Sequence, residues 1–225
     1  MSPVLAALPF LGTTMLARLF HHSHARAPRT GIAWLAIVIG LSSTMPALAI
    51  DARRPTVDMI PIRAEAHPPP GARGLCATYD WACATSGQFL PIGESVMQTV
   101  RAVNSKANRI IRPVSDINQY RIAERWSLPT ARGGDCEDYA LYKKRELIRA
   151  GIPAEQLLIA AVLDRKRQSH AVLILRTGTQ DLVLDNMTSR ILPWHKTGYT
   201  FLRLQDPRQP ARWVSVMAGG MLPNS

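Results

Sequence analysis

A cysteine stands where a helix is expected to begin. Residues 133–137 read Gly-Gly-Asp-Cys-Glu, good helix formers continue to Ala150, and Gly151 and Pro153 then end the pattern. A helix start has unpaired N–H groups and the positive end of the helix dipole, both of which favour a thiolate over a thiol. Because the thiolate is the reactive form, Cys136 is the candidate nucleophile of this chain.

A histidine and an aspartate occupy matching positions on two later segments. His170 begins the apolar run 171–175, Asp185 closes the run 182–184, and residues 177–180 between them have the composition of a turn. The pattern predicts a β-hairpin in which both side chains lie at the same edge of the sheet. The two residues can therefore supply the base and the orienting carboxylate that an activated cysteine needs.

The helix that follows Cys136 is predicted to be amphipathic. At 100° per residue, Cys136, Ala140 and Leu147 share one stripe, whereas Asp138 lies on the opposite side. The thiol is thus expected on the packed side, with its exposed end opening onto a cleft. We expect the basic run 143–145 to form a solvated face.

The remaining hydrophobic patterns predict a mixed fold. Residues 93–108 carry valines and an alanine at helical spacing, typical of a core helix. Helices come first and strands afterwards, which favours an α+β fold with an antiparallel sheet against the helix of Cys136. The strand-like runs are 157–163, 171–175, 182–185, 199–204 and 213–217.

Four motifs together resemble the bacterial transglutaminase-like cysteine proteinases, from Pro91 to the C-terminus. The motifs are Gly-Asp-Cys-Glu-Asp-Tyr-Ala at 134–140, His-Ala-Val at 170–172, Leu-Val-Leu-Asp-Asn at 182–186 and Trp-x-x-Pro at 126–129. The resemblance implies a papain-like, transglutaminase-like core and a secreted cysteine endopeptidase acting through an acyl-enzyme. Cys136 would be the nucleophile, His170 the general base and then acid, and Asp185 the orienting group.

Two other functions fit the same residues. The same triad serves transglutaminase-type acyl transfer to an amine, and a binding module can keep the fold without turnover. The complete set of three residues argues against the binding module. The Cys136 backbone N–H is the expected oxyanion donor, with Trp126 as a weak candidate for the second.

The acidic residues around Cys136 have two open interpretations. Asp135 can cap the helix, with Asp138 completing a variant capping box and Glu137 favoured by the helix dipole. Adhesin-cleaving relatives instead bind calcium through acidic residues that flank the nucleophile. Asp135 and Glu137 match those positions, Asp138 less clearly, and carboxylate oxygens are the ligands that Ca²⁺ prefers.

The N-terminal sequence predicts export. An apolar run at 32–41 follows Arg26 and Arg29 and precedes Pro-Ala-Leu-Ala at 46–49, the pattern of a cleavable signal peptide over residues 1–49. The segment before the run is long for a signal peptide, so Met15 is an alternative start. The resemblance implies a periplasmic location.

Residues 50–90 are rich in proline and are expected to form an extended arm, poorly ordered over 51–74, before the peptidase domain at 91–225. Cys76 and Cys83 lie close together in this arm. In an oxidising compartment they can pair, which would leave Cys136 as the free thiol. The alternative is two buried thiols.

The chain is basic, with a net charge of +11. Removing residues 1–49 takes away three arginines and no acid, which leaves +8. For an exported protein this favours acidic protein substrates or anionic membrane surfaces over nucleic acid. The resemblance implies a cell-surface or periplasmic protein as the substrate. If that substrate is a surface adhesin, the resemblance also implies an inner-membrane receptor as a regulatory partner.

Overall fold

The structure is a computed structural model, and it describes residues 57–222. It contains a seven-stranded antiparallel sheet in the order β1-β7-β6-β2-β3-β4-β5. The expected signal peptide, residues 1–49, lies outside the described residues. The strands are β1 Ala64–Ala66, β2 Leu157–Leu163, β3 Ser169–Arg176, β4 Asp181–Leu184, β5 Leu192–Pro193, β6 Thr200–Asp206 and β7 Gln209–Ala218.

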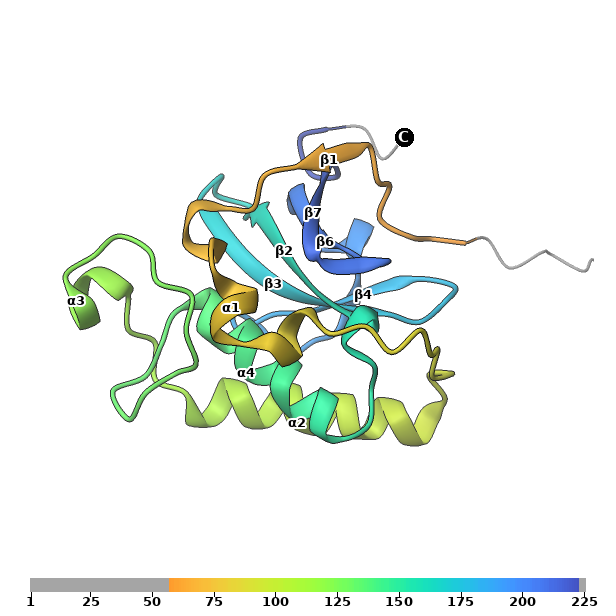
Figure 1. Cartoon of the computed structure of the whole chain (residues 1–225), viewed down its shortest axis with the longest axis horizontal. Coiled ribbons are helices and arrows are strands. Elements are labelled where there is room, and N and C mark those ends of the chain that lie inside the picture. Colours follow the sequence, from red (N-terminus) through yellow and green to blue (C-terminus); the bar gives the residue numbers. More distant parts are fainter. Residues whose placement is uncertain (1–56, 223–225) are drawn as a thin grey trace, which may run out of the picture. The chain divides into compact units, whose positions relative to one another are not determined.

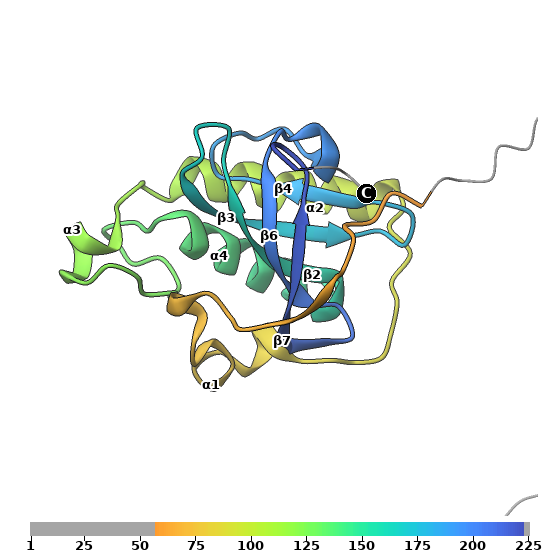
Figure 2. The ribbon, with the colours of Figure 1, turned by 90° about the horizontal axis from the view of Figure 1, so that it is seen from above.

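The helices precede most of the sheet in sequence, and the two longest, α2 Glu94–Ile110 and α4 Cys136–Arg149, lie on one side of it. Helix α4 lies directly against β2 and β3, and α2 packs on α4 from outside (Figures 1 and 2). Among residues 57–222, no helix is both long and apolar enough to cross a membrane. The helices are α1 Leu75–Thr78, α2 Glu94–Ile110, α3 Asp116–Tyr120 and α4 Cys136–Arg149, with short 3₁₀ turns at Pro70–Ala72, Asp80–Cys83, Ala154–Gln156 and Trp194–Lys196.

The central strands are buried on both faces. On one face of the sheet, Ile159 and Leu173 pack against Leu141 and Leu147 of α4 in one apolar cluster. On the other face, the neighbouring strand residues join a second cluster around Phe201. Because both faces of the sheet are covered, β2 and β3 are continuous apolar runs and do not alternate between apolar and polar residues. The expected α+β fold with an antiparallel sheet is confirmed.

The segment 57–90 is not a poorly ordered arm. Its strand β1 pairs with β7, so that Ala64 lies opposite Ser215. Ile60, only 2% exposed, belongs to the apolar cluster around Phe201, and Leu75 belongs to the cluster that packs against α4. Prolines fix an extended backbone but do not prevent the apolar residues between them from being buried. Cys76 and Cys83 form a disulfide, as expected, and Cys136 is a free cysteine.

The expectation of a solvated face on α4 is also wrong. Asp138, Lys143 and Lys144 are all fully buried, because the sheet covers one side of the helix and α2 another. Asp138 accepts hydrogen bonds from the backbone N–H of Ser127, at 3.0 Å, and from its hydroxyl, at 3.3 Å. Burial raises the Asp138 pKa to about 7.

A buried glutamine ties α4 to the sheet. Gln205 Oε1 accepts hydrogen bonds from Lys144 Nζ at 2.8 Å and from the Ile159 backbone N–H at 3.0 Å. Its Nε2 donates to the Pro210 carbonyl at 2.9 Å. Burial lowers the Lys144 pKa to about 7, so the ammonium depends on this acceptor.

We expect Gln205→Leu to lower the free energy of unfolding by about 3 kcal/mol, because the buried ammonium and the Ile159 N–H lose their acceptor. Chemical denaturation of the mature protein measures the loss. Adding Lys144→Met to this variant removes the stranded charge and should restore part of the stability. An unchanged loss in the double variant would show that Lys144 does not depend on Gln205.

Candidate active site

Cys136 is the first residue of α4 and lies between two hollows of the surface. One cavity of about 640 Å³ and another of about 360 Å³ share Cys136, Ser169 and His170 in their linings. The thiol and the imidazole therefore face the same space. The sequence prediction that the thiol opens onto a cleft is confirmed.

Two glycines allow the chain to approach this helix start closely. Gly133 has a φ of 122°, and a Cβ there would lie 2.0 Å from the Arg112 carbonyl oxygen. A Cβ on Gly134 would lie 2.5 Å from Asp138 Oδ2. The Gly134 N–H donates to the Arg112 carbonyl at 3.0 Å, and the Val114 N–H donates to the Gly134 carbonyl at 3.1 Å. These contacts hold the loop before α3 against the start of α4.

The histidine and aspartate meet as the hairpin pattern predicted. His170 Nε2 and Asp185 Oδ1 are 2.9 Å apart, and the two residues are 9% and 3% exposed. Strands β3 and β4 pair so that Leu173 lies opposite Leu184, which brings the start of β3 and the residue after β4 together. Asp185 thus fixes the imidazole through its Nε2, and the opposite side of the ring faces the cavities.

A tyrosine that the sequence analysis did not identify completes this pair. The Tyr199 hydroxyl donates to Asp185 Oδ2 at 2.5 Å, and the Met187 N–H donates to Asp185 Oδ1 at 3.0 Å. Burial would raise the Asp185 pKa, but the hydrogen bonds from His170 and Tyr199 outweigh it and hold the pKa below its usual value. Asp185 therefore stays ionised beside the imidazole.

The Cys136 thiol donates its hydrogen bond to Glu137 Oε2, at 3.1 Å, rather than to the imidazole. The Ala171 backbone N–H is also directed at the sulfur. Burial, followed by the negative charge of Glu137, raises the pKa of the Cys136 thiol far above its usual value. The position of Cys136 at the helix start thus does not by itself lower the pKa of its thiol.

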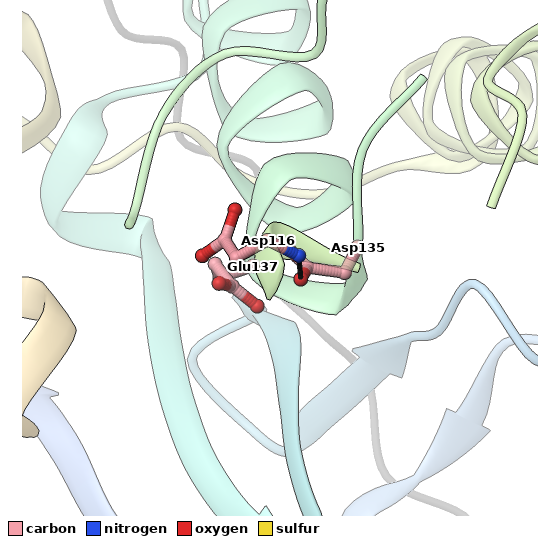
Figure 3. A group of neighbouring side chains, drawn as sticks. All are labelled: Asp116, Asp135 and Glu137. Atoms are coloured by element: carbon pink, nitrogen blue, oxygen red, sulfur yellow. Dashed lines mark hydrogen bonds between the residues drawn. The ribbon is translucent and has the colours of Figure 1, made fainter. Parts of the chain in front are cut away.

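Three carboxylates converge beside the thiol (Figure 3). Asp116, Asp135 and Glu137 each offer an oxygen, and these oxygens lie within 4.8 Å of one another. Asp116 comes from the start of α3 and was not identified from the sequence, because no local pattern links it to Cys136. Its backbone N–H donates to Asp135 Oδ2 at 3.0 Å, the dashed contact in Figure 3.

The capping interpretation fails for Asp135 and Asp138, whereas Glu137 lies in the first turn of α4 and its carboxylate accepts its own backbone N–H. Asp135 occupies the N-cap position of α4, but its side chain makes no hydrogen bond to the helix N–H groups. Asp138 binds Ser127 instead of completing a capping box. Burial and the neighbouring Asp135 raise the Glu137 pKa to about 9, and Asp135 Oδ1 is buried without a hydrogen-bond partner. The cluster therefore has the donor set of a cation site rather than of a cap.

Trp126 forms part of the wall of the larger cavity. Its indole N–H donates to Glu124 Oε2 at 3.4 Å. The expectation that Trp126 supplies a second oxyanion donor therefore finds no support in its contacts. The ring also stands edge-on to Trp213, with centroids 5.8 Å apart, so its role here is packing.

A cysteine at a helix start, beside a buried histidine held by a carboxylate, is the arrangement of cysteine hydrolases and acyl transferases. The chain belongs to the bacterial transglutaminase-like cysteine proteinase family, whose model matches residues 62–220.

Among solved structures, the chain is similar to LapG of Legionella pneumophila. The calcium-bound form is 27% identical with a TM-score of 0.44, and the match covers 48% of this chain and 64% of that one. The EGTA-treated form is 25% identical with a TM-score of 0.42, covering 48% and 62%. The match thus spans less than two thirds of LapG. No curated protein sequence matches the chain.

We expect Tyr199→Phe to lower the peptidase kcat about tenfold with little change in KM, because Asp185 loses one of the bonds that fix it behind His170. Steady-state kinetics at matched folded concentration measure both constants. Tyr142→Phe removes a hydroxyl from another tyrosine of the domain and should have no such effect. Equal kinetics in wild type and Tyr199→Phe would remove the positioning role.

Proposed function

We propose that this peptidase is an endopeptidase in which Cys136, His170 and Asp185 act as nucleophile, general base and orienting carboxylate. The observation that carries the proposal is the buried His170–Asp185 pair, 2.9 Å apart, whose imidazole lines the same cavities as the Cys136 thiol. Cavities on both sides of the thiol suit a polypeptide that continues past the scissile bond in both directions.

His170 takes the thiol proton as the Cys136 sulfur attacks the scissile carbonyl carbon and forms the C–S bond. The oxyanion is stabilised by the Cys136 backbone N–H at the start of α4. His170 then gives the proton to the leaving amine as the C–N bond breaks, which leaves a thioester. Water, deprotonated by His170, hydrolyses the thioester and restores the thiol. Asp185 stays ionised and fixes the orientation of the imidazole.

We also propose that Asp116, Asp135 and Glu137 hold a calcium ion. Three converging carboxylates, two of them beside the thiol, match the oxygen ligands of Ca²⁺. The unpartnered Asp135 Oδ1 and the raised Glu137 pKa are the features of a site that lacks a counter-charge. When bound, the cation would offset the carboxylate charge that disfavours the Cys136 thiolate.

The proposed place of action is the periplasm, after removal of residues 1–49, and the proposed substrate is a periplasmic or cell-surface protein such as an adhesin. The Cys76–Cys83 disulfide suits an oxidising compartment. The same proposal includes an inner-membrane receptor as the regulator of the protein and no role in binding nucleic acid. The match to the family model from residue 62 supports the peptidase chemistry of this assignment.

We expect the mature protein to generate new N-termini in periplasmic and outer-membrane proteins of its source, and Cys136→Ala and His170→Ala to abolish them. Mass spectrometry of labelled N-termini gives the measurement. His195→Gln, which changes a histidine paired with Asp58 outside the site, serves as the matched control and should keep activity. Amine-labelled or crosslinked products without new termini would select acyl transfer instead.

Calcium should raise the melting temperature of the mature protein, and a chelator should reverse the change. At a hundredfold excess over Kd the stabilisation is about 2.7 kcal/mol, which corresponds to about 5–10 °C for a domain of this size. Scanning calorimetry measures the shift, and titration calorimetry measures binding.

Asp116→Asn should weaken calcium binding while leaving the melting temperature in chelator nearly unchanged. Glu94→Gln, an exposed acid paired with Arg101 at the start of α2, should behave as wild type. An unchanged melting temperature with and without calcium in the wild-type protein would rule the site out.

A further inference from the structure

The two cavities that meet at Cys136 have different surroundings. The larger one has a mainly apolar wall that includes Trp126, Val162 and Met217. The smaller one adjoins a further hollow of about 290 Å³, with which it shares Asp164 and Met187. The lining of that hollow includes Arg165, Lys166 and Arg190, which we call the basic rim. The larger cavity is thus mainly apolar, although Glu124, Glu137 and Arg203 also line it. The smaller cavity, which Asp135 also lines, leads to positive charge.

The charges of the basic rim are available to a ligand. All three side chains belong to exposed residues, and none forms an ion pair with any residue between 57 and 222. Asp164, the acid of this hollow, uses Oδ1 to accept the N–H groups of Lys166 at 2.7 Å and Gln168 at 2.8 Å. Its carboxylate therefore shapes the turn.

The rim stands on a supported backbone close to the imidazole. Arg165 Nε donates to the Thr197 carbonyl at 2.8 Å, which fixes the base of its guanidinium but leaves the outer N–H groups. Lys166 lies in the β2–β3 turn, a few residues before His170 at the start of β3. This turn and the start of α4 lie at the same end of the domain (Figures 1 and 2).

The rim defines which substrate positions it can contact. An extended peptide advances about 3.3 Å per residue. A chain leaving Cys136 through the smaller cavity therefore comes beside the rim a few residues from the scissile bond, because the smaller cavity and the rim hollow share Asp164 and Met187. The hollow on the other side of loop 112–115 is lined by Arg112 and Arg132, and the Arg132 guanidinium donates to the carbonyls of Asn118 and Gln119.

We propose that the basic rim binds an acidic stretch of the substrate, a few residues to one side of the cleaved bond, while apolar residues on the other side occupy the larger cavity. The inference rests on the proposed endopeptidase function and specifies its substrate class. Carboxylates of an extended chain would replace the missing counter-charges of Lys166 and Arg190.

The test uses a diverse library of synthetic peptides with cleavage sites read by mass spectrometry, on mature wild-type protein and on Cys136→Ala. We expect Asp and Glu to be enriched on one side of the cleaved bonds. Replacing those acids by Asn and Gln in the best peptide should lower kcat/KM about tenfold, the sum of a few exposed charge contacts. Added salt should slow cleavage of the acidic peptide and leave its amide counterpart unchanged.

The charge-reversed variant Lys166→Glu/Arg190→Glu should lose the preference for acidic peptides and keep cleavage of the amide counterpart. Arg208→Glu makes the same change in the β6–β7 turn. Strand β6 begins at Thr200, which pairs with Leu163 beside the β2–β3 turn. The β6–β7 turn follows the opposite end of β6 and is therefore distant from the basic rim. This control should keep the preference.

The outcomes separate the two proposals. No cleavage by wild type, or cleavage that persists in Cys136→Ala, refutes the endopeptidase function. Cleavage that depends on Cys136 but shows no preference for acids refutes only the proposed role of the basic rim. A preference for acids that survives charge reversal has the same consequence. Phosphatidylglycerol vesicles that bind wild type but not the charge-reversed variant, with the peptide preference unchanged, would also overturn it and assign the rim to a membrane surface.

Discussion

The packing of α4 between the sheet and α2 is the constraint on which the site depends. The helix begins at Cys136 and rests on β2 and β3, so the thiol lies against the start of β3, where His170 and Ala171 follow each other. The apolar clusters on both faces of the sheet hold this arrangement. A shift of α4 by one turn would move the thiol about 5.4 Å along the helix axis and out of line with the imidazole.

Burial of α4 on two sides brings an unusual amount of charge into the interior. Lys144 and Asp138 find specific partners in Gln205 and Ser127. Lys143 Nζ has no hydrogen-bond partner among the described residues but lies over the Tyr139 ring, 5.9 Å from its centroid. Burial lowers the Lys143 pKa to about 7, although the charge of Asp185 opposes this. Buried charges of this kind give little stability for their cost. Lys143 adds positive potential near the carboxylate that orients His170.

The electrostatics of the site divide into two regions with opposite effects. Around Asp185, donors from His170, Tyr199 and Met187 favour the ionised carboxylate. Around Cys136, burial and the negative charges of Glu137 and Asp135 favour the protonated thiol. The same acids that would hold a cation thus oppose the nucleophile when no cation balances them, which couples any metal in this cluster to the state of the thiol.

The sequence determined the local features of this protein. The Gly-Gly-Asp-Cys start of α4, the continuous apolar strands and the β3–β4 turn are short-range patterns, and they predicted Cys136, His170 and Asp185 together with the α+β fold. Tertiary structure decided what depends on distant contacts. Asp116 joins Asp135 only because the loop before α3 docks on Gly134, and Tyr199 reaches Asp185 from beyond β5. Lys143 and Lys144 belong to a basic run that is typical of a solvent-exposed helix face, yet α2 and the sheet bury them. Burial depends on which elements pack around a residue, and local composition does not specify that packing.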